Sequence, residues 1–173
     1  GSMVLDMISE SIALLENTAF ISGTGAGQPT GILTRLGTVK TLATSDAYDS
    51  TNVELFKSGA NGTFTGDNLI NFFHKLKDAY QSTATWIMNR QTIATVRTLK
   101  GSTNDHYLWQ PGLSAGNPST LLGAPVVAAA DMAVAATGSY SIAVGDFKKA
   151  YTIVDGKNIT VLRDPYSNKP YIN

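Results

Sequence analysis

The sequence contains no cysteine and has few charged residues. The lack of cysteine excludes disulfides, thiolate metal sites and a cysteine nucleophile. Only 15% of the 173 residues are charged, whereas soluble surfaces carry about 25–35% charged residues. The 13 basic residues balance the 13 acidic ones, and no basic patch of the kind that binds nucleic acid is visible. We therefore expect no specific nucleic-acid binding, and a surface suited to contact with neighbouring proteins.

Long apolar runs are also missing. No stretch approaches the ~18–20 apolar residues that a membrane span needs, and the start lacks the pattern of a signal peptide. We therefore expect no membrane partner. The segment Gly1-Ser2-Met3 resembles a cloning scar, so the chain is expected to be a piece of a longer protein. Its length suits one domain, and a 43% share of hydrophobic residues argues against disorder.

Hydrophobic periodicity predicts three helices. The first covers residues 4–20 and ends at the glycines that follow residue 22, because glycine adopts the left-handed conformation of a helix end at little cost. The second covers residues 69–80 after N-cap candidates at residues 65–68, and the third covers residues 90–99 after Asn89. The apolar positions of the first helix are Leu5, Ile8, Ile12, Leu15 and Ala19.

Strand signals fall mostly in the second half of the chain. Residues 34–65 are rich in small polar residues and are predicted to be loop with one or two short strands. The run at residues 85–88 is apolar and predicts a buried strand. Further strands are predicted at residues 120–122, 125–130, 141–144, 151–154 and 158–162, with a helical turn at residues 147–150. Early helices followed by late strands indicate an α+β fold.

The spacing Gly23-x-Gly25-x-Gly27 superficially suggests a nucleotide site. A dinucleotide fingerprint needs G-x-G-x-x-G between a strand and a helix, and here the glycines follow a helix. A Walker loop would end in G-K-[ST], which is missing here. The three glycines are therefore interpreted as a helix end and turn.

Few residues suit catalysis or metal binding. His74 and His106 are the only histidines and lack metal-ligand spacing; His74 is interpreted as a partly buried packing residue. The nucleophile elbow G-x-S-x-G is missing, although a triad assembled from distant residues stays open. Asp146 and Asp164 are interpreted as turn formers. We predict no catalytic, cofactor-binding or metal site, hence no enzyme; a small hydrolase or binding domain remains the alternative, recognisable by a pocket that joins a histidine, a carboxylate and a serine.

The aromatic residues have two interpretations. They could form a base-stacking platform, but no basic residues are interleaved with them, so core or subunit-contact positions are expected. These residues are Phe72, Phe73, Trp86, Tyr107 and Trp109.

Six segments, taken together and in order, resemble the major capsid proteins of tailed phages, the family with the Hong Kong 97 fold. The most specific is the glycine-rich helix end that continues into Gln28-Pro29-Thr30-Gly31-Ile32. The resemblance extends over about residues 8–166. The segments are residues 16–33 (ENTAFISGTGAGQPTGIL), 84–90 (ATWIMNR), 107–111 (YLWQP), 118–127 (PSTLLGAPVV), 145–155 (GDFKKAYTIVD) and 163–166 (RDPY).

This resemblance implies an architecture, namely a fragment of that capsid fold with a mixed sheet, flanking helices and one long N-terminal helix. Residues 1–3 would be the scar, residues 4–22 the C-terminal part of the spine helix of the peripheral domain, and residues 23–173 mainly the axial domain with connecting segments. The N-terminal arm and extended loop of the family would be missing. Ile8, Ile12 and Leu15 would then lack their usual partners, so the helix is expected to pair with a second copy.

The resemblance also implies a function. The chain would be a structural subunit of the icosahedral capsid of a bacteriophage or prophage, a shell that encloses DNA and assembles in the cytoplasm of the bacterial host. Its partners would be other copies of itself, as pentamers and hexamers, with scaffold, protease and portal proteins as further candidates. Residues 34–65 and 107–111 are the expected contact surfaces. Some members carry a Lys–Asn crosslink, but no crosslinking residue is assigned here. An encapsulin-like compartment shell is the alternative within the same fold.

Overall fold

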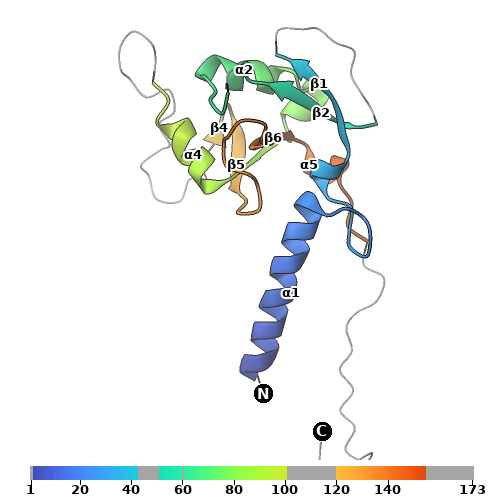
Figure 1. Ribbon diagram of the computed structural model, residues 1–173. Coiled ribbons are helices and arrows are strands. Elements are labelled where there is room, and N and C mark those ends of the chain that lie inside the picture. The colour runs from blue at the N-terminus through green and yellow to red at the C-terminus, as the bar shows by residue number, and fades with distance from the viewer. Residues whose placement is uncertain (1, 43–50, 60, 101–119, 155–173) are drawn as a thin grey trace, which may run out of the picture.

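A computed structural model describes residues 2–42, 51–59, 61–100 and 120–154. One long helix, α1 (Ser2–Ser22), projects from a body built of two small sheets and several short helices (Figure 1). The α+β class and the long N-terminal helix are therefore confirmed. Helix α1 extends two residues beyond the predicted range at each end. None of the helices in the described part of the chain is long and apolar enough to cross a membrane.

A mixed four-stranded sheet forms the centre of the body. Its strands are β3 (Thr85–Met88), β4 (Thr120–Leu121), β5 (Ala124–Ala128) and β6 (Ile142–Gly145), in the order β4-β5-β3-β6. Strand β3 runs parallel to β5 and antiparallel to β6. Four strands are thus confirmed at the predicted places, with ends shifted by one or two residues. The central strand β3 is the segment whose apolar run predicted burial.

A tight hairpin joins β4 to β5. Its two central residues, Leu122 and Gly123, have φ of 52° and 81°, the pair of positive values that a two-residue type I′ turn requires. Glycine adopts this conformation freely, whereas leucine does so at a cost of roughly 1–2 kcal/mol.

Helices α2 (Gly66–His74) and α4 (Arg90–Arg97) begin at the predicted caps. The side chain of Thr65 accepts a hydrogen bond from the backbone N–H of Asn68, and that of Asn89 accepts one from Gln91. The amide of Asn89 also donates to the carbonyl oxygens of Ala130 and Met132, at 3.1 and 2.9 Å. This one residue therefore caps a helix and ties down the segment that follows β5.

The helix predicted at residues 69–80 is in fact two helices. Helix α2 ends at His74, Lys77 is extended (φ −58°, ψ 141°), and α3 (Asp78–Gln81) follows. The Gln81 amide donates to the carbonyl oxygen of Leu76, 2.8 Å away. In a continuous helix the carbonyl oxygen of Leu76 would accept a hydrogen bond from a backbone N–H of the next turn. At the break, the Gln81 side chain supplies that hydrogen bond instead.

The core lies between the central sheet and helices α2 and α4. Trp86 and Met88 have no exposed surface, and the Trp86 indole N–H donates to the carbonyl oxygen of Leu121, 3.0 Å away. The ring of Trp86 stacks on Phe73 with centroids 5.8 Å apart. The cluster of buried apolar residues consists of Leu69, Phe73, Ala84, Trp86, Met88, Val96, Leu121 and Ala124.

The region of residues 34–65 carries two short strands, as predicted. Strands β1 (Leu36–Thr41) and β2 (Val53–Lys57) pair in parallel, after a 3-10 turn η1 (Ile32–Thr34). Lys40 Nζ lies 2.9 Å from the carboxylate of Glu54 across this pair, and both side chains are mostly buried.

The last described element is α5 (Phe147–Ala150), at the predicted helical turn. The strand predicted at residues 151–154 is wrong, because this segment is not paired in a sheet. Tyr151 turns toward α1 instead, and Val154 is 85% exposed. The strand predicted at residues 158–162 lies outside the described residues.

Candidate assembly site

The end of α1 folds back on itself through the glycine-rich segment. The backbone N–H of Gly31 and the hydroxyl of Thr34 both donate to the carbonyl oxygen of Gly23, at 2.8 and 2.6 Å. A Cβ on Gly23 would collide with the carbonyl oxygens of Ala19 and Pro29, and one on Gly31 would lie 2.6 Å from the nitrogen of Gly23. Both positions therefore need glycine because two backbone segments touch.

The three glycines after α1 are required for two different reasons, not only for the left-handed conformation expected from the sequence. Gly25 and Gly27 are left-handed, with φ of 82° and 69°, as a helix end of this kind allows. Gly23, which directly follows the helix, does not have a positive φ and is required by close contact instead.

Two distant residues hold this turn against the body. The hydroxyl of Tyr151 donates to the carbonyl oxygen of Thr30, 2.8 Å away, and its ring meets Phe20 edge-on with centroids 6.2 Å apart. The hydroxyl of Thr18 donates to the carboxylate of Asp131, also at 2.8 Å. We call this arrangement of Thr18, Phe20, Thr30, Asp131 and Tyr151 the α1 joint.

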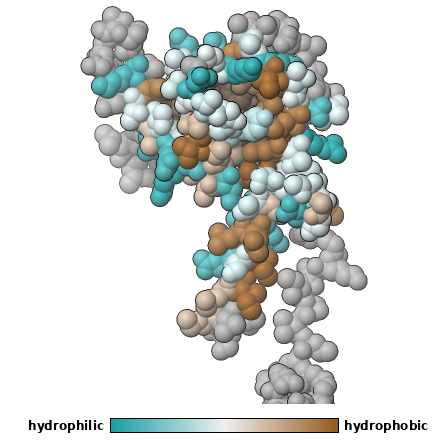
Figure 2. Space-filling view, in the orientation of Figure 1, coloured by the Kyte–Doolittle hydropathy of each residue, from teal (hydrophilic) through white to brown (hydrophobic). Residues whose placement is uncertain are grey.

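Beyond the joint, α1 presents apolar side chains to solvent. Met3 is 74% exposed and Leu15 72%, and Figure 2 shows hydrophobic surface along the length of the projecting helix. The helix contains three acidic residues and no basic one. Among the described side chains of the helix, the other large exposed apolar ones are Met7, Ile8 and Leu14. A contiguous apolar surface of this kind is typical of a protein–protein contact.

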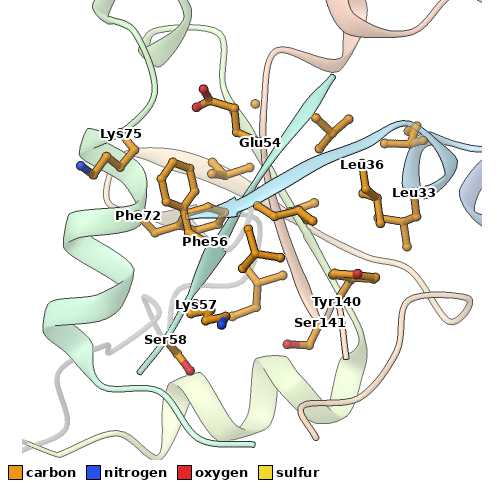
Figure 3. A pocket seen from close by; sticks show the side chains of 18 of the residues that line it. Leu33, Leu36, Glu54, Phe56, Lys57, Ser58, Phe72, Lys75, Tyr140 and Ser141 are labelled. Atoms are coloured by element: carbon orange, nitrogen blue, oxygen red, sulfur yellow. The ribbon is translucent and has the colours of Figure 1, made fainter. Parts of the chain in front are cut away.

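A second surface feature is a hollow of about 1140 Å³ between the β1–β2 pair and the body. Phe56 and Phe72 lie side by side in it, with centroids 5.8 Å apart (Figure 3). Leu33 of η1 and Leu36 at the start of β1 also line it, and Tyr140 and Ser141 line it from the segment that leads into β6. Its lining includes described residues of 34–65, one of the two predicted contact surfaces. The other, residues 107–111, lies outside the described residues.

Asp146 has the most distinctive electrostatic environment among the described residues. Its carboxylate accepts a hydrogen bond from the Thr83 hydroxyl at 2.7 Å and lies 3.5 Å from Lys149 Nζ. The Thr83 hydrogen bond, aided by Lys149, holds the pKa of Asp146 below its ordinary value of 3.8. The ammonium group of Lys149 also lies 5.2 Å from the centre of the Tyr80 ring. Asp146 is therefore a buried structural anchor before α5, which goes beyond the turn-forming role expected from its sequence context.

The residues considered for chemistry do not come together. His74 is exposed, not partly buried as predicted, because α2 turns it outward beside the edge of Phe73. Within the described residues, no three histidine, aspartate or glutamate side chains form a group that could hold a metal. His106 and Asp164 lie outside the described part of the chain.

Three of the five aromatic residues named above lie in the described part of the chain, and all three belong to the core or pack against it. Phe73 and Trp86 are buried in the core and Phe72 packs against it, as predicted. Tyr107 and Trp109 lie outside the described residues. Sequence reasoning missed Tyr151 and Asp131, since the only local signals were the segment around Tyr151 that resembles the phage family and an unremarkable aspartate after β5.

Comparison with known proteins places these features in a family. The model of the phage capsid family matches residues 2–173. Two solved structures are similar: the capsid of an empty GTA particle, with a TM-score of 0.81 and 34% identity, and the capsid of a native GTA particle, with 0.78 and 32%. Each match covers 99% of this chain and 57% of the other chain.

No curated protein matches the chain. The family match extends over nearly all of it, and the solved relatives exceed 30% identity with nearly full coverage. The chain therefore belongs to the phage capsid family.

Proposed function

We propose that this chain is part of a structural subunit that assembles into the capsid of a bacteriophage or prophage. The observation that carries the proposal is the agreement of family and fold over the whole chain, with capsids as the solved relatives. The chain spans little more than half the length of these relatives. The function therefore belongs to the subunit as a whole, of which this chain supplies one part.

The proposed mechanism is self-association through many modest contacts, closed by symmetry into a shell. The hollow under β1 and β2, beside the exposed Val39 and Val53, is the contact surface that supports it. A low share of charged residues and a net charge of zero suit surfaces that are covered by neighbours.

Residues 4–22 are proposed to be the C-terminal part of the spine helix of a peripheral domain. Residues 23–173 then form mainly the axial domain with its connecting segments. The projection of α1 from the body supports this division (Figure 1). The apolar face of α1 would be covered in the complete subunit by parts of the peripheral domain.

The proposed partners are other copies of the subunit, arranged as pentamers and hexamers. Scaffold, protease and portal proteins are further candidates, and assembly is proposed to occur in the cytoplasm of the bacterial host. The match to the phage capsid family favours this function over an encapsulin-like compartment. The hydrolase alternative required a pocket that joins histidine, carboxylate and serine, and the described hollow has no histidine in its lining.

Sedimentation of the full-length subunit, meaning this chain with any flanking sequence that its gene encodes, tests the proposal. Material produced in bacteria should sediment as particles far larger than a monomer. Glutamate at Val39 and Val53, which are exposed on β1 and β2, should shift it to small species without unfolding. A wild-type subunit that remains a monomer under all conditions, including with the neighbouring phage-type genes co-expressed, would contradict it.

A further inference from the structure

Among the described residues, helix α1 is attached to the body at its C-terminal end. From Met3 to Thr18, every side chain that the structure describes is exposed except that of Ile12, which is half-buried. Contacts with the body begin at Thr18 and continue through Phe20 to the glycine-rich turn. Within the described part of the chain, the residues of the α1 joint therefore carry the contacts that orient the helix.

A helix held in this way is a lever. With 21 residues at about 1.5 Å each, its length is roughly 30 Å, so a tilt of about 10° at the base moves the far end by roughly 5 Å. That displacement exceeds the tolerance of a packed apolar contact, in which side chains interdigitate closely. Small changes at the joint therefore control where Met3 and Met7 meet a partner.

The contacts of Asp131 and Tyr151 lie on opposite sides of α1. Thr18 and Phe20 are two positions apart, which corresponds to about 200° around the helix axis. Asp131 holds Thr18 from one side and Tyr151 meets Phe20 from the other. We propose that Asp131 and Tyr151 form a two-point clamp that sets the angle between α1 and the four-stranded sheet.

The two points differ in strength. Thr18 and Asp131 are both exposed and share one hydrogen bond, which water competes for. Tyr151 is half-buried and combines a ring contact with a hydrogen bond to the turn. The contact of Gly23 with Gly31 stiffens the same turn. When α1 tilts relative to the body, the hydrogen bond between Thr18 and Asp131 thus breaks first, and the contacts of Tyr151 keep the helix attached.

A clamp of this kind has a consequence that rests on the proposed function. Closed shells require each copy to meet its neighbours at a consistent angle, and contacts that do not close produce open assemblies. A subunit with a loosened clamp should therefore form assemblies of mixed size. The clamp itself can be tested without any assembly.

Distances between two spin labels, measured by double electron–electron resonance, report the angle directly. The chain has no cysteine, so labels attach only where cysteine is introduced, at the exposed positions Ala13 on α1 and Ala94 on α4. Excess unlabelled protein removes distances between copies. The labelled wild type should give one narrow distribution, and a broad one would overturn the clamp.

Clamp variants are then compared in this labelled chain. Thr18→Val should broaden the distribution, Tyr151→Phe should broaden it through loss of the hydroxyl alone, and the double variant should broaden it more. The controls Thr137→Val and Tyr140→Phe, on exposed side chains outside the joint, should retain the wild-type width. A double variant with wild-type width and wild-type circular dichroism would overturn the clamp.

The same two substitutions in the full-length subunit test the consequence. Electron microscopy should show wild-type shells of one diameter and variant assemblies of several diameters. Uniform shells from the double variant would overturn the control of assembly by the clamp. A wild type without shells would contradict the proposed function, whereas the label distances would still decide whether the clamp exists.

Discussion

The carboxylate of Asp146 accepts a hydrogen bond from the hydroxyl of Thr83, with 2.7 Å between the two oxygen atoms. Thr83 lies 63 residues earlier in the chain. Thr83 lies just before the central strand β3, and Asp146 lies between β6 and α5. Only 5% of the Asp146 side chain is exposed. The bond therefore links the start of the central strand to the segment that delivers Tyr151 to α1.

This bond predicts a dependence of stability on pH. The pKa of Asp146 is lowered by folding, so its stabilising effect is present above the ordinary value of 3.8 and is lost as the pH falls below it through the folded value. Asp146→Asn should lower the urea midpoint at neutral pH, and its difference from wild type should shrink below pH 3.8. Thr83→Val should weaken the same dependence, whereas Thr137→Val should not. A constant difference between Asp146→Asn and wild type across this range would refute the role of the bond.

Thr92 offers a stabilising substitution. Its hydroxyl is buried in α4 without a hydrogen-bond partner among the described residues, and such a group costs about 1–3 kcal/mol. Thr92→Val, which retains the shape, should raise the free energy of unfolding by about 1 kcal/mol and the melting temperature by about 2–4 °C. The control is Thr95→Val on the exposed face of the same helix, where little change is expected. Destabilisation by Thr92→Val in calorimetry would mean that the hydroxyl has a partner.

Replacing Leu122 should also increase the free energy of unfolding. It holds a left-handed conformation at a hairpin tip and is 42% exposed, so little burial offsets its backbone cost. Leu122→Asn should stabilise the chain by about 0.5–1 kcal/mol, because asparagine tolerates this conformation in a type I′ turn. Leu122→Ala removes the same apolar surface without relieving the backbone and should give no gain. Equal effects of the two variants in urea unfolding would argue against strain at this residue.

The exposed face of α1 predicts self-association of the chain in solution. Ile8 and Leu15 lie on one side of the helix and are 50% and 72% exposed, and covering such side chains contributes about 25 cal/mol per Å². Analytical ultracentrifugation should show a concentration-dependent dimer, and Ile8→Glu with Leu15→Glu should give a monomer. Ser9→Glu and Ala13→Glu on the opposite side serve as the control and should leave the dimer intact. If the dimer persists in the variant that carries Ile8→Glu and Leu15→Glu, it must form through another surface.

Local signals account for the part of the fold that could be predicted from the sequence. The caps Thr65 and Asn89 and the apolar run of β3 act within a few residues, and their elements were confirmed. The break between α2 and α3 depends on Gln81 reaching back to Leu76, which periodicity does not reveal. The strand predicted at residues 151–154 is wrong because Tyr151 contacts the turn after α1, where its hydroxyl donates to the carbonyl oxygen of Thr30, 121 positions earlier.

The same distinction applies to the candidate assembly site. The glycine-rich segment was recognisable through its resemblance to the family, yet its reason is spatial, since Gly23 and Gly31 meet only once the turn has folded. The bond of Thr18 to Asp131 spans 113 positions, and neither residue carries a signal in its neighbourhood. Family resemblance thus predicted what the chain belongs to, whereas the joint became visible only in the structure.

Electron microscopy of the full-length subunit, produced in a bacterial host and separated by size, tests the central claim most directly. We expect closed shells, or rings of five and six subunits, with α1 and the body of this chain recognisable in each subunit. A preparation that contains only monomers or small oligomers, even with the neighbouring phage-type genes co-expressed, would contradict it.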